Sequence, residues 1–186
     1  MRVRGESDIT DLFSDGLWPP LRVSGLSGLG IIIMRYYVME PSGNILLPLA
    51  PKGDGAEVVK ATALERFREI DYDSRSELVS DRLKLLLERY LPRYDFKPVV
   101  YLDFEKKEQT VFWRFRPPCY DKYQASYRND GIVSRFSFLD SNAPIVFTAR
   151  SPKGVRSIVV RMAVAESALR RCILGLKFTK IPEVVE

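Results

Sequence analysis

Hydrophobic and polar positions along the chain show two periodicities, one typical of strands and one typical of helices. Helices are predicted at residues 56–69 and from Ser74 to the residue before Pro92, where apolar positions recur every three to four residues. Ser74 and Glu77 form a capping-box pattern at the second start. Strands are predicted from short β-branched or aromatic runs at residues 29–39, 45–50, 97–104, 110–116, 131–139 and 143–149.

The last element, residues 151–176, has two interpretations. Ser151 as N-cap, Pro152 at the first helical position and Gly175 as a stop predict one long helix. Its apolar residues keep helical spacing over about six turns. The alternative makes the β-branched stretch "VRSIVVRM" a strand and starts a shorter helix near Ala163. The persistent spacing favours the long helix.

The order of elements predicts the fold class. Strands come in runs and do not alternate one by one with helices, which is typical of an α+β fold. We expect an irregular arm at residues 1–28, followed by a single α+β domain at residues 29–186. That domain has the order ββ-αα-ββ-ββ-α: a mainly antiparallel sheet, two mid-chain helices and a long C-terminal helix.

Composition narrows the class of protein. The N-terminus lacks the apolar core of a secretory signal, and no apolar run approaches the roughly 20 residues of a membrane helix. We therefore expect a soluble, cytoplasmic protein with no membrane partner. Cys119 and Cys172 have no CxxC partner, which predicts two reduced, buried thiols and no structural zinc.

Histidine is absent from the sequence. Serine–histidine and cysteine–histidine nucleophiles and His-ligated zinc are thereby excluded. An enzyme built from this chain would have to use carboxylates, lysine, tyrosine or an oxygen-bound metal. The sequence thus favours a binding or accessory protein over an enzyme, without a cofactor or bound metal.

Positive charge is concentrated in the second half of the chain. Residues 1–100 carry 14 Lys and Arg against 15 Asp and Glu, a net charge of −1, whereas residues 101–186 carry 15 against 9, a net charge of +6. Residues 150–180 hold eight basic side chains and only Glu166 as an acid. This asymmetry indicates an anionic partner, or alternatively a solvated face or a contact with the acidic half.

The stretch "TVFWRFR" at residues 110–116 interleaves aromatic and basic side chains. In a strand, Val111, Trp113 and Phe115 share one face, which predicts that they fill the core while Arg114 and Arg116 face water. The alternative is a platform in which these arginines and the following tyrosines bind a single nucleic-acid strand by stacking and phosphate contacts.

The stretch "ARSPKG" at residues 149–154 is a second candidate site. If the long helix forms, its N-terminus presents free N–H groups beside Ser151, Arg150 and Lys153, and Arg156 lies on its outward side. Such a helix end binds phosphate readily. Plain capping without a ligand is the alternative.

A third candidate is enzymatic. Asp95 is followed about ten residues later by Glu105-x-Lys107, a spacing that is similar to the signature of PD-(D/E)XK nucleases. This resemblance implies two carboxylates that hold Mg²⁺ and a lysine that positions or activates water. Glu77 or Glu88 on the preceding helix supplies a further candidate acid. Glu105 and Lys107, however, fall at a predicted hairpin turn, whereas the family places its motif on a strand.

The favoured hypothesis is therefore a binding protein that holds nucleic acid or another polyanion through its C-terminal half. Its predicted contact residues are Arg114, Arg116, Arg150, Ser151, Lys153 and Arg156. Two alternatives stay open: a metal-dependent nuclease, and a subunit whose protein partner covers the aromatic segment.

Overall fold

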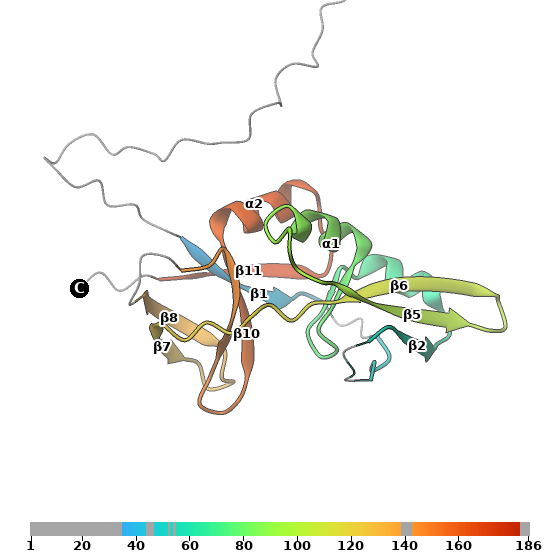
Figure 1. Cartoon of the computed structure of the whole chain (residues 1–186), viewed down its shortest axis with the longest axis horizontal. Coiled ribbons are helices and arrows are strands. Elements are labelled where there is room, and N and C mark those ends of the chain that lie inside the picture. The colour runs from blue at the N-terminus through green and yellow to red at the C-terminus, as the bar shows by residue number, and fades with distance from the viewer. Residues whose placement is uncertain (1–34, 44–46, 52, 54, 139–142, 183–186) are drawn as a thin grey trace, which may run out of the picture. The chain divides into compact units, whose positions relative to one another are not determined.

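Strands dominate the fold: 42% of the described residues lie in strands and 17% in helices. The computed structural model describes residues 35–43, 47–51, 53, 55–138 and 143–182, so the predicted arm at 1–28 lies outside them. The strands are β1 (Tyr36–Pro41), β2 (Glu57–Lys60), β3 (Tyr72–Asp73), β4 (Leu78–Ser80), β5 (Lys97–Asp103), β6 (Glu108–Arg114), β7 (Tyr123–Tyr127), β8 (Val133–Phe138), β9 (Val146–Arg150), β10 (Arg156–Arg161) and β11 (Leu176–Ile181). The helices are α1 (Asp81–Glu88), α2 (Met162–Arg170) and a 3-10 helix, η1 (Leu64–Glu69) (Figure 1).

The prediction of an α+β fold with a long C-terminal helix is wrong. Residues 151–176 hold a turn, strand β10 and the short helix α2, as the second interpretation of this segment had it. Residues 157–160 are buried on both faces of a sheet, and a continuous apolar run fits helical and strand spacing equally well. The β-branched side chains of Ile158, Val159 and Val160 favour the strand.

Two further predictions in the first half are also wrong. Residues 47–50 form no strand; β1 pairs instead with β10 and β11. The predicted helix at 56–69 is strand β2 followed by η1. In both cases the partner strands are distant in the sequence: those of β1 lie more than 100 residues away, and β2 pairs with β5, where Glu57 is opposite Val99. No local pattern predicts these partners.

Helix α1 starts later than the capping box suggests. Ser80, not Ser74, is its N-cap, and its hydroxyl accepts a hydrogen bond from the Leu83 N–H at 3.2 Å. The predicted apolar face is buried at Leu83, Leu86 and Leu87. Leu78, which was assigned to the helix, lies in β4.

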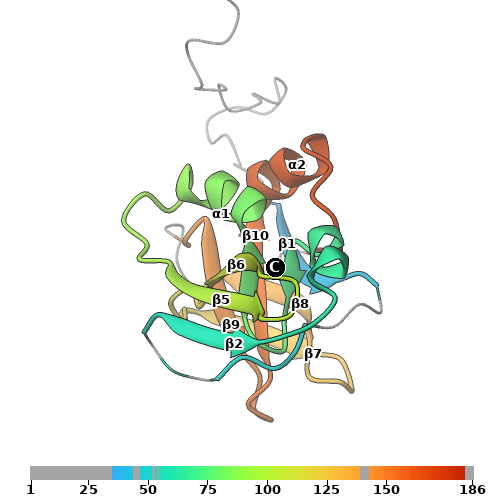
Figure 2. The same ribbon diagram turned by 90° about the vertical axis from the view of Figure 1, so that its right-hand side faces the viewer.

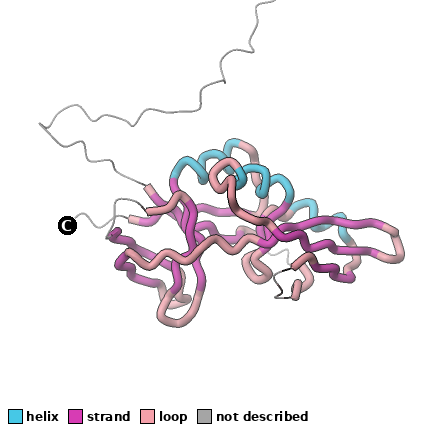
Figure 3. Tube along the Cα trace, viewed as in Figure 1, coloured by secondary structure: helices cyan, strands magenta, loops and turns pink. Residues whose placement is uncertain are grey.

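The strands, magenta in Figure 3, form three sheets. Sheet A has the order β11-β1-β10-β9 and is antiparallel throughout. Sheet B has the order β2-β5-β6-β4-β3, in which only the β2–β5 pair is parallel. Sheet C is the two-stranded ribbon of β7 and β8. Helix α2 packs on β1 and β10, while α1 packs beside it on β4 and β6 (Figure 2).

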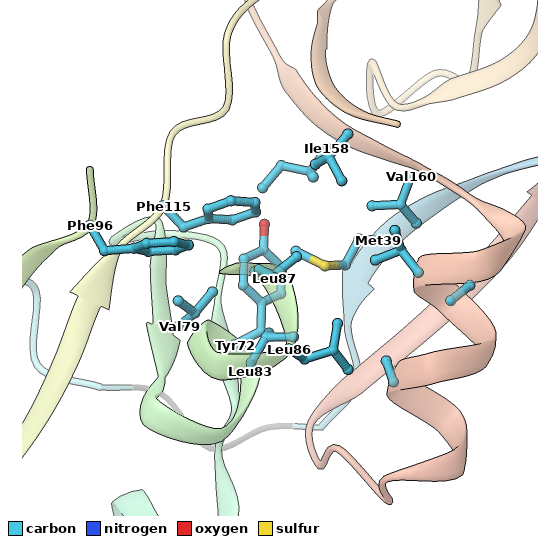
Figure 4. Packing of buried hydrophobic residues seen from close by; sticks show 14 residues of the cluster. Met39, Tyr72, Val79, Leu83, Leu86, Leu87, Phe96, Phe115, Ile158 and Val160 are labelled. Carbon is cyan, nitrogen blue, oxygen red and sulfur yellow. The ribbon is translucent and has the colours of Figure 1, made fainter. Parts of the chain in front are cut away.

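The largest hydrophobic cluster joins the two larger sheets and both helices (Figure 4). Two smaller clusters lie on the other faces: one between sheet B, η1 and residues 47–50, and one between sheets A and C. Members of the largest cluster include Met39, Tyr72, Val79, Leu83, Leu86, Leu87, Phe115 and Ile158. Sheets A and B are therefore covered on both faces over much of their area, which explains their β-branched and aromatic composition.

Two expectations from composition can be compared with the structure. Neither α1 nor α2 has the length and apolar character needed to cross a membrane, and the same holds for every helix of the described residues. Cys119 and Cys172 are free thiols, but both are exposed, so their predicted burial is wrong.

Candidate anion-binding site

Arg114 does not face water. Its side chain is 4% exposed, because β6 presents Phe112 and Arg114 to the interior and Val111 and Trp113 to the other, half-exposed face. The predicted orientation is therefore wrong for Arg114, whereas Phe115, directly after the strand, is fully buried as predicted. The Arg114 guanidinium pairs with Glu57 at 2.6 Å and donates to the carbonyls of Pro51 and Ser76. Arg114 is a buried structural residue and is not placed to bind an external phosphate.

Arg116 is placed differently. It follows β6 at the edge of the core, one quarter exposed, and its Nε donates to the Glu77 carboxylate. Its backbone N–H donates to the hydroxyl of Tyr94, which fixes the position of the chain at this point. Glu77 lies in the turn between β3 and β4 and is 22% exposed. This ion pair is accessible to solvent on one side.

The "ARSPKG" stretch forms a hairpin turn between β9 and β10, so the predicted helix N-terminus does not exist. Ser151 is buried, and its hydroxyl accepts a hydrogen bond from the Val155 N–H at 3.1 Å. The Gly154 N–H closes the turn on the Ser151 carbonyl. Lys153 lies in the exposed part of the turn, where its Nζ donates to the Asn129 carbonyl. Ser151 therefore shapes the turn and does not offer a hydroxyl to a ligand.

The hairpin nevertheless brings two of the predicted arginines together, and Glu77 joins a third to them. Arg150 and Arg156 are directly opposite in the β9–β10 register, so their side chains leave the same face of sheet A. Arg156 donates from Nη1 to Glu77 Oε1 at 2.6 Å, while Arg116 binds the other oxygen of the same carboxylate. We call Arg116, Arg150 and Arg156 the arginine cluster.

Among the described residues, the arginine cluster holds more positive charge than Glu77 neutralises. Like charges directly opposite in a sheet destabilise the pair. Glu77 compensates part of this repulsion, but Arg150 forms no ion pair with any residue that the structure describes. Among the described residues, Glu77 is the carboxylate that pairs with this cluster, and it contacts two of the three arginines; Lys153, at the tip of the hairpin, donates to Asn129 instead. An anionic ligand would relieve the remaining repulsion.

Two tyrosines hold Arg150 in place through its backbone. The Arg150 N–H donates to the Tyr123 hydroxyl at 3.1 Å, and the Tyr127 hydroxyl donates to the Arg150 carbonyl at 3.0 Å. Burial, reinforced by the neighbouring Tyr123 hydroxyl, raises the pKa of Tyr127, so it stays a neutral donor. These contacts leave the Arg150 side chain as the exposed part of the residue.

The tyrosines after Pro117 and Pro118 lie in a segment for which the sequence predicts no strand. This segment contains strand β7, whose inward tyrosines pack in the cluster between sheets A and C. Tyr123 meets Phe136 edge to face with ring centroids 4.6 Å apart. The chain therefore covers much of its own aromatic segment, which weakens both the stacking platform and the idea that a partner covers it. The alternation of Tyr123, Ala125 and Tyr127 was a strand signal that the sequence analysis missed.

The residues of the nuclease-like signature are not brought together. Asp95 precedes β5 and pairs with Lys97, whereas Glu105 lies in the turn after β5. At about 3.3 Å per residue, the strand separates them by roughly 20 Å or more. Within the described ranges, no three acidic or cysteine side chains are grouped so that they could hold a metal ion. The geometry gives the metal-dependent nuclease no support.

Lys107 has a local conformational role. It ends the four-residue turn between β5 and β6 with φ of 54°, a left-handed conformation that usually favours glycine. We expect Lys107→Gly to raise the free energy of unfolding by about 0.5–1 kcal/mol, measured by urea denaturation. Lys106 donates its N–H to the turn-closing Asp103, and Lys106→Gly is the matched control. A gain in Lys106→Gly equal to that in Lys107→Gly would contradict the explanation.

Glu77 is the central residue that the sequence analysis assigned to another role. The sequence indicates only a capping residue or a spare acid at this position, because its two arginine partners are 39 and 79 positions away. No signal in the local pattern identifies it. Only the pairing of β4 with β6 brings Arg116 to Glu77, and only the packing of sheet A brings Arg156.

No known protein-family model matches the sequence, and no curated protein matches it. The function therefore has to be argued from the site itself.

Proposed function

We propose that this chain is a binding protein that holds nucleic acid by its phosphate backbone at the arginine cluster. The observation that carries the proposal is the arrangement of the arginine cluster, in which Glu77 joins Arg116 to Arg156 and Arg150 lies directly opposite Arg156. Guanidinium groups donate two parallel hydrogen bonds to a phosphate and keep their charge at all physiological pH values.

The character of the site favours backbone contacts over base readout. Arg150 is exposed, and its backbone is fixed by Tyr123 and Tyr127, so its side chain is presented from a rigid strand end. Phosphate contacts position a protein on nucleic acid without reading its sequence. We therefore propose weak sequence preference and a strong dependence of affinity on salt.

The test measures the binding of a fluorescein-labelled single-stranded oligonucleotide by anisotropy across a salt series. Wild-type affinity should fall steeply with salt, and Arg150→Ala should weaken binding by about tenfold, or about 1.4 kcal/mol. The slope of log K against log salt should become shallower by about 0.7, the value for one lost phosphate contact on a single strand.

Two controls sharpen this experiment. Arg170→Ala removes an exposed arginine on α2 whose pair with Glu166 is 3.9 Å long, and it should leave binding unchanged. Arg150→Lys keeps the charge and should restore most of the affinity. Equal effects of Arg150→Ala and Arg170→Ala, or binding of a sulfated polysaccharide but no oligonucleotide, would refute the proposal.

A further inference from the structure

The Glu77 carboxylate occupies the position of a bound anion. One of its oxygens accepts from Arg156 and the other from Arg116, so two guanidinium groups clamp one carboxylate. The three side chains are between 22% and 32% exposed. A phosphate presents pairs of oxygens from one centre in much the same way as a carboxylate does, and arginine forks bind both groups.

The backbone of Glu77 is held independently of its carboxylate. Its carbonyl accepts a hydrogen bond from the Phe115 N–H at 2.8 Å. Its φ of 54° is a left-handed conformation that costs a non-glycine residue roughly 1–2 kcal/mol. The side chain can therefore rotate away from the arginines while the turn between β3 and β4 keeps its position.

The side chain of Tyr72 lies near the Glu77 carboxylate on the interior side. Tyr72 is 94% buried, and its hydroxyl forms no hydrogen bond within the described part of the chain. Figure 4 shows the hydroxyl directed toward Phe115, which precedes Arg116 by one position, and toward Ile158, which follows Arg156 by two. Burial, and then the nearby carboxylates of Glu77 and Asp73, raise the pKa of Tyr72, so the hydroxyl remains a donor.

We propose that Glu77 is an internal stand-in for phosphate, and that a phosphate group of the ligand displaces it from Arg116 and Arg156. This inference rests on the proposed function and identifies the ligand group at its centre. In the unliganded protein Glu77 neutralises the site and lowers its affinity. In the complex a phosphate lies between the two arginines, and Arg150 binds the next phosphate along the strand.

The experiment removes the Glu77 charge in two ways. Glu77→Gln keeps the size of the side chain, and Glu77→Gly suits the left-handed backbone, so a folded variant is available even if one of them is unstable. Both should bind the labelled oligonucleotide about tenfold more tightly than wild type at low salt, because the competing carboxylate is gone. Glu166→Gln removes the same charge from exposed helix α2 and should change affinity less than about twofold.

The outcomes separate this inference from the proposed function. If wild type binds and Arg150→Ala weakens binding, but Glu77→Gln binds no more tightly than Glu166→Gln, Glu77 is only structural and the inference fails alone. If no variant binds the oligonucleotide, both proposals fail. Weaker binding of Glu77→Gly with an unchanged thermal midpoint would also overturn the inference, because the carboxylate would then be organising the arginines for the ligand.

Discussion

Arg114→Ala should lower the free energy of unfolding by about 3–5 kcal/mol, as removal of one partner of a buried ion pair typically does. The substitution leaves the Glu57 carboxylate, only 12% exposed, without its charged partner. It also removes donors to the carbonyls of Pro51 and Ser76. Urea denaturation followed by tryptophan fluorescence measures the loss.

An exposed arginine provides the control for this prediction. Arg170→Ala removes the same side chain where it is 71% exposed, and it should cost less than about 0.5 kcal/mol. A second variant, Arg114→Met with Glu57→Leu, replaces the pair by apolar side chains and should be more stable than Arg114→Ala. A loss below about 1 kcal/mol in Arg114→Ala would show that water reaches Glu57 and that the pair is not truly buried.

Phe147→Ala should destabilise the protein by a comparable amount, about 3–5 kcal/mol. Phe147 is completely buried in β9, at the centre of the aromatic cluster between sheets A and C. Its ring centroid lies 5.2 Å from Tyr120, 5.9 Å from Phe136 and 6.0 Å from Tyr36. Truncation opens a cavity that these rigid rings cannot fill.

The part of the structure that loses protection from hydrogen exchange distinguishes this prediction from a general loss of stability. Hydrogen exchange in β7 and β8 should accelerate more than in β5 and β6, because sheet C packs on sheet A through this cluster. Phe104→Ala removes the same ring from an exposed turn, where it is 62% exposed, and should cost less than about 0.5 kcal/mol. Uniform exchange across both sheets would contradict the assigned role of Phe147.

Short-range patterns predicted the elements whose partners are close in sequence. The hairpin of β5 and β6 was expected because a polar turn separates two β-rich runs, and the structure confirms it. The apolar face of α1 followed from the spacing of Leu83, Leu86 and Leu87. In these cases the local periodicity and the tertiary environment demand the same conformation.

Patterns failed where tertiary contacts decided between two local conformations. Residues 156–161 have helical spacing, but they sit in the middle of sheet A between β1 and β9. Residues 57–60 were assigned to a helix and became an edge strand beside β5. Arg114 was assigned to the surface because arginine is rarely buried, and Glu57, which permits its burial, lies 57 positions earlier.

The same distinction between local pattern and tertiary contact applies to the candidate site. The sequence by itself determined that the C-terminal half is basic, that histidine chemistry is excluded and that Arg116, Arg150 and Arg156 were worth considering. Only the tertiary structure decided that Arg114 is internal, that Ser151 belongs to a turn and that Glu77 joins two of the arginines. The physical reason is that charge and composition are properties of residues, whereas an ion pair requires two side chains to meet. Here that meeting depends on strand pairings between segments far apart in the chain.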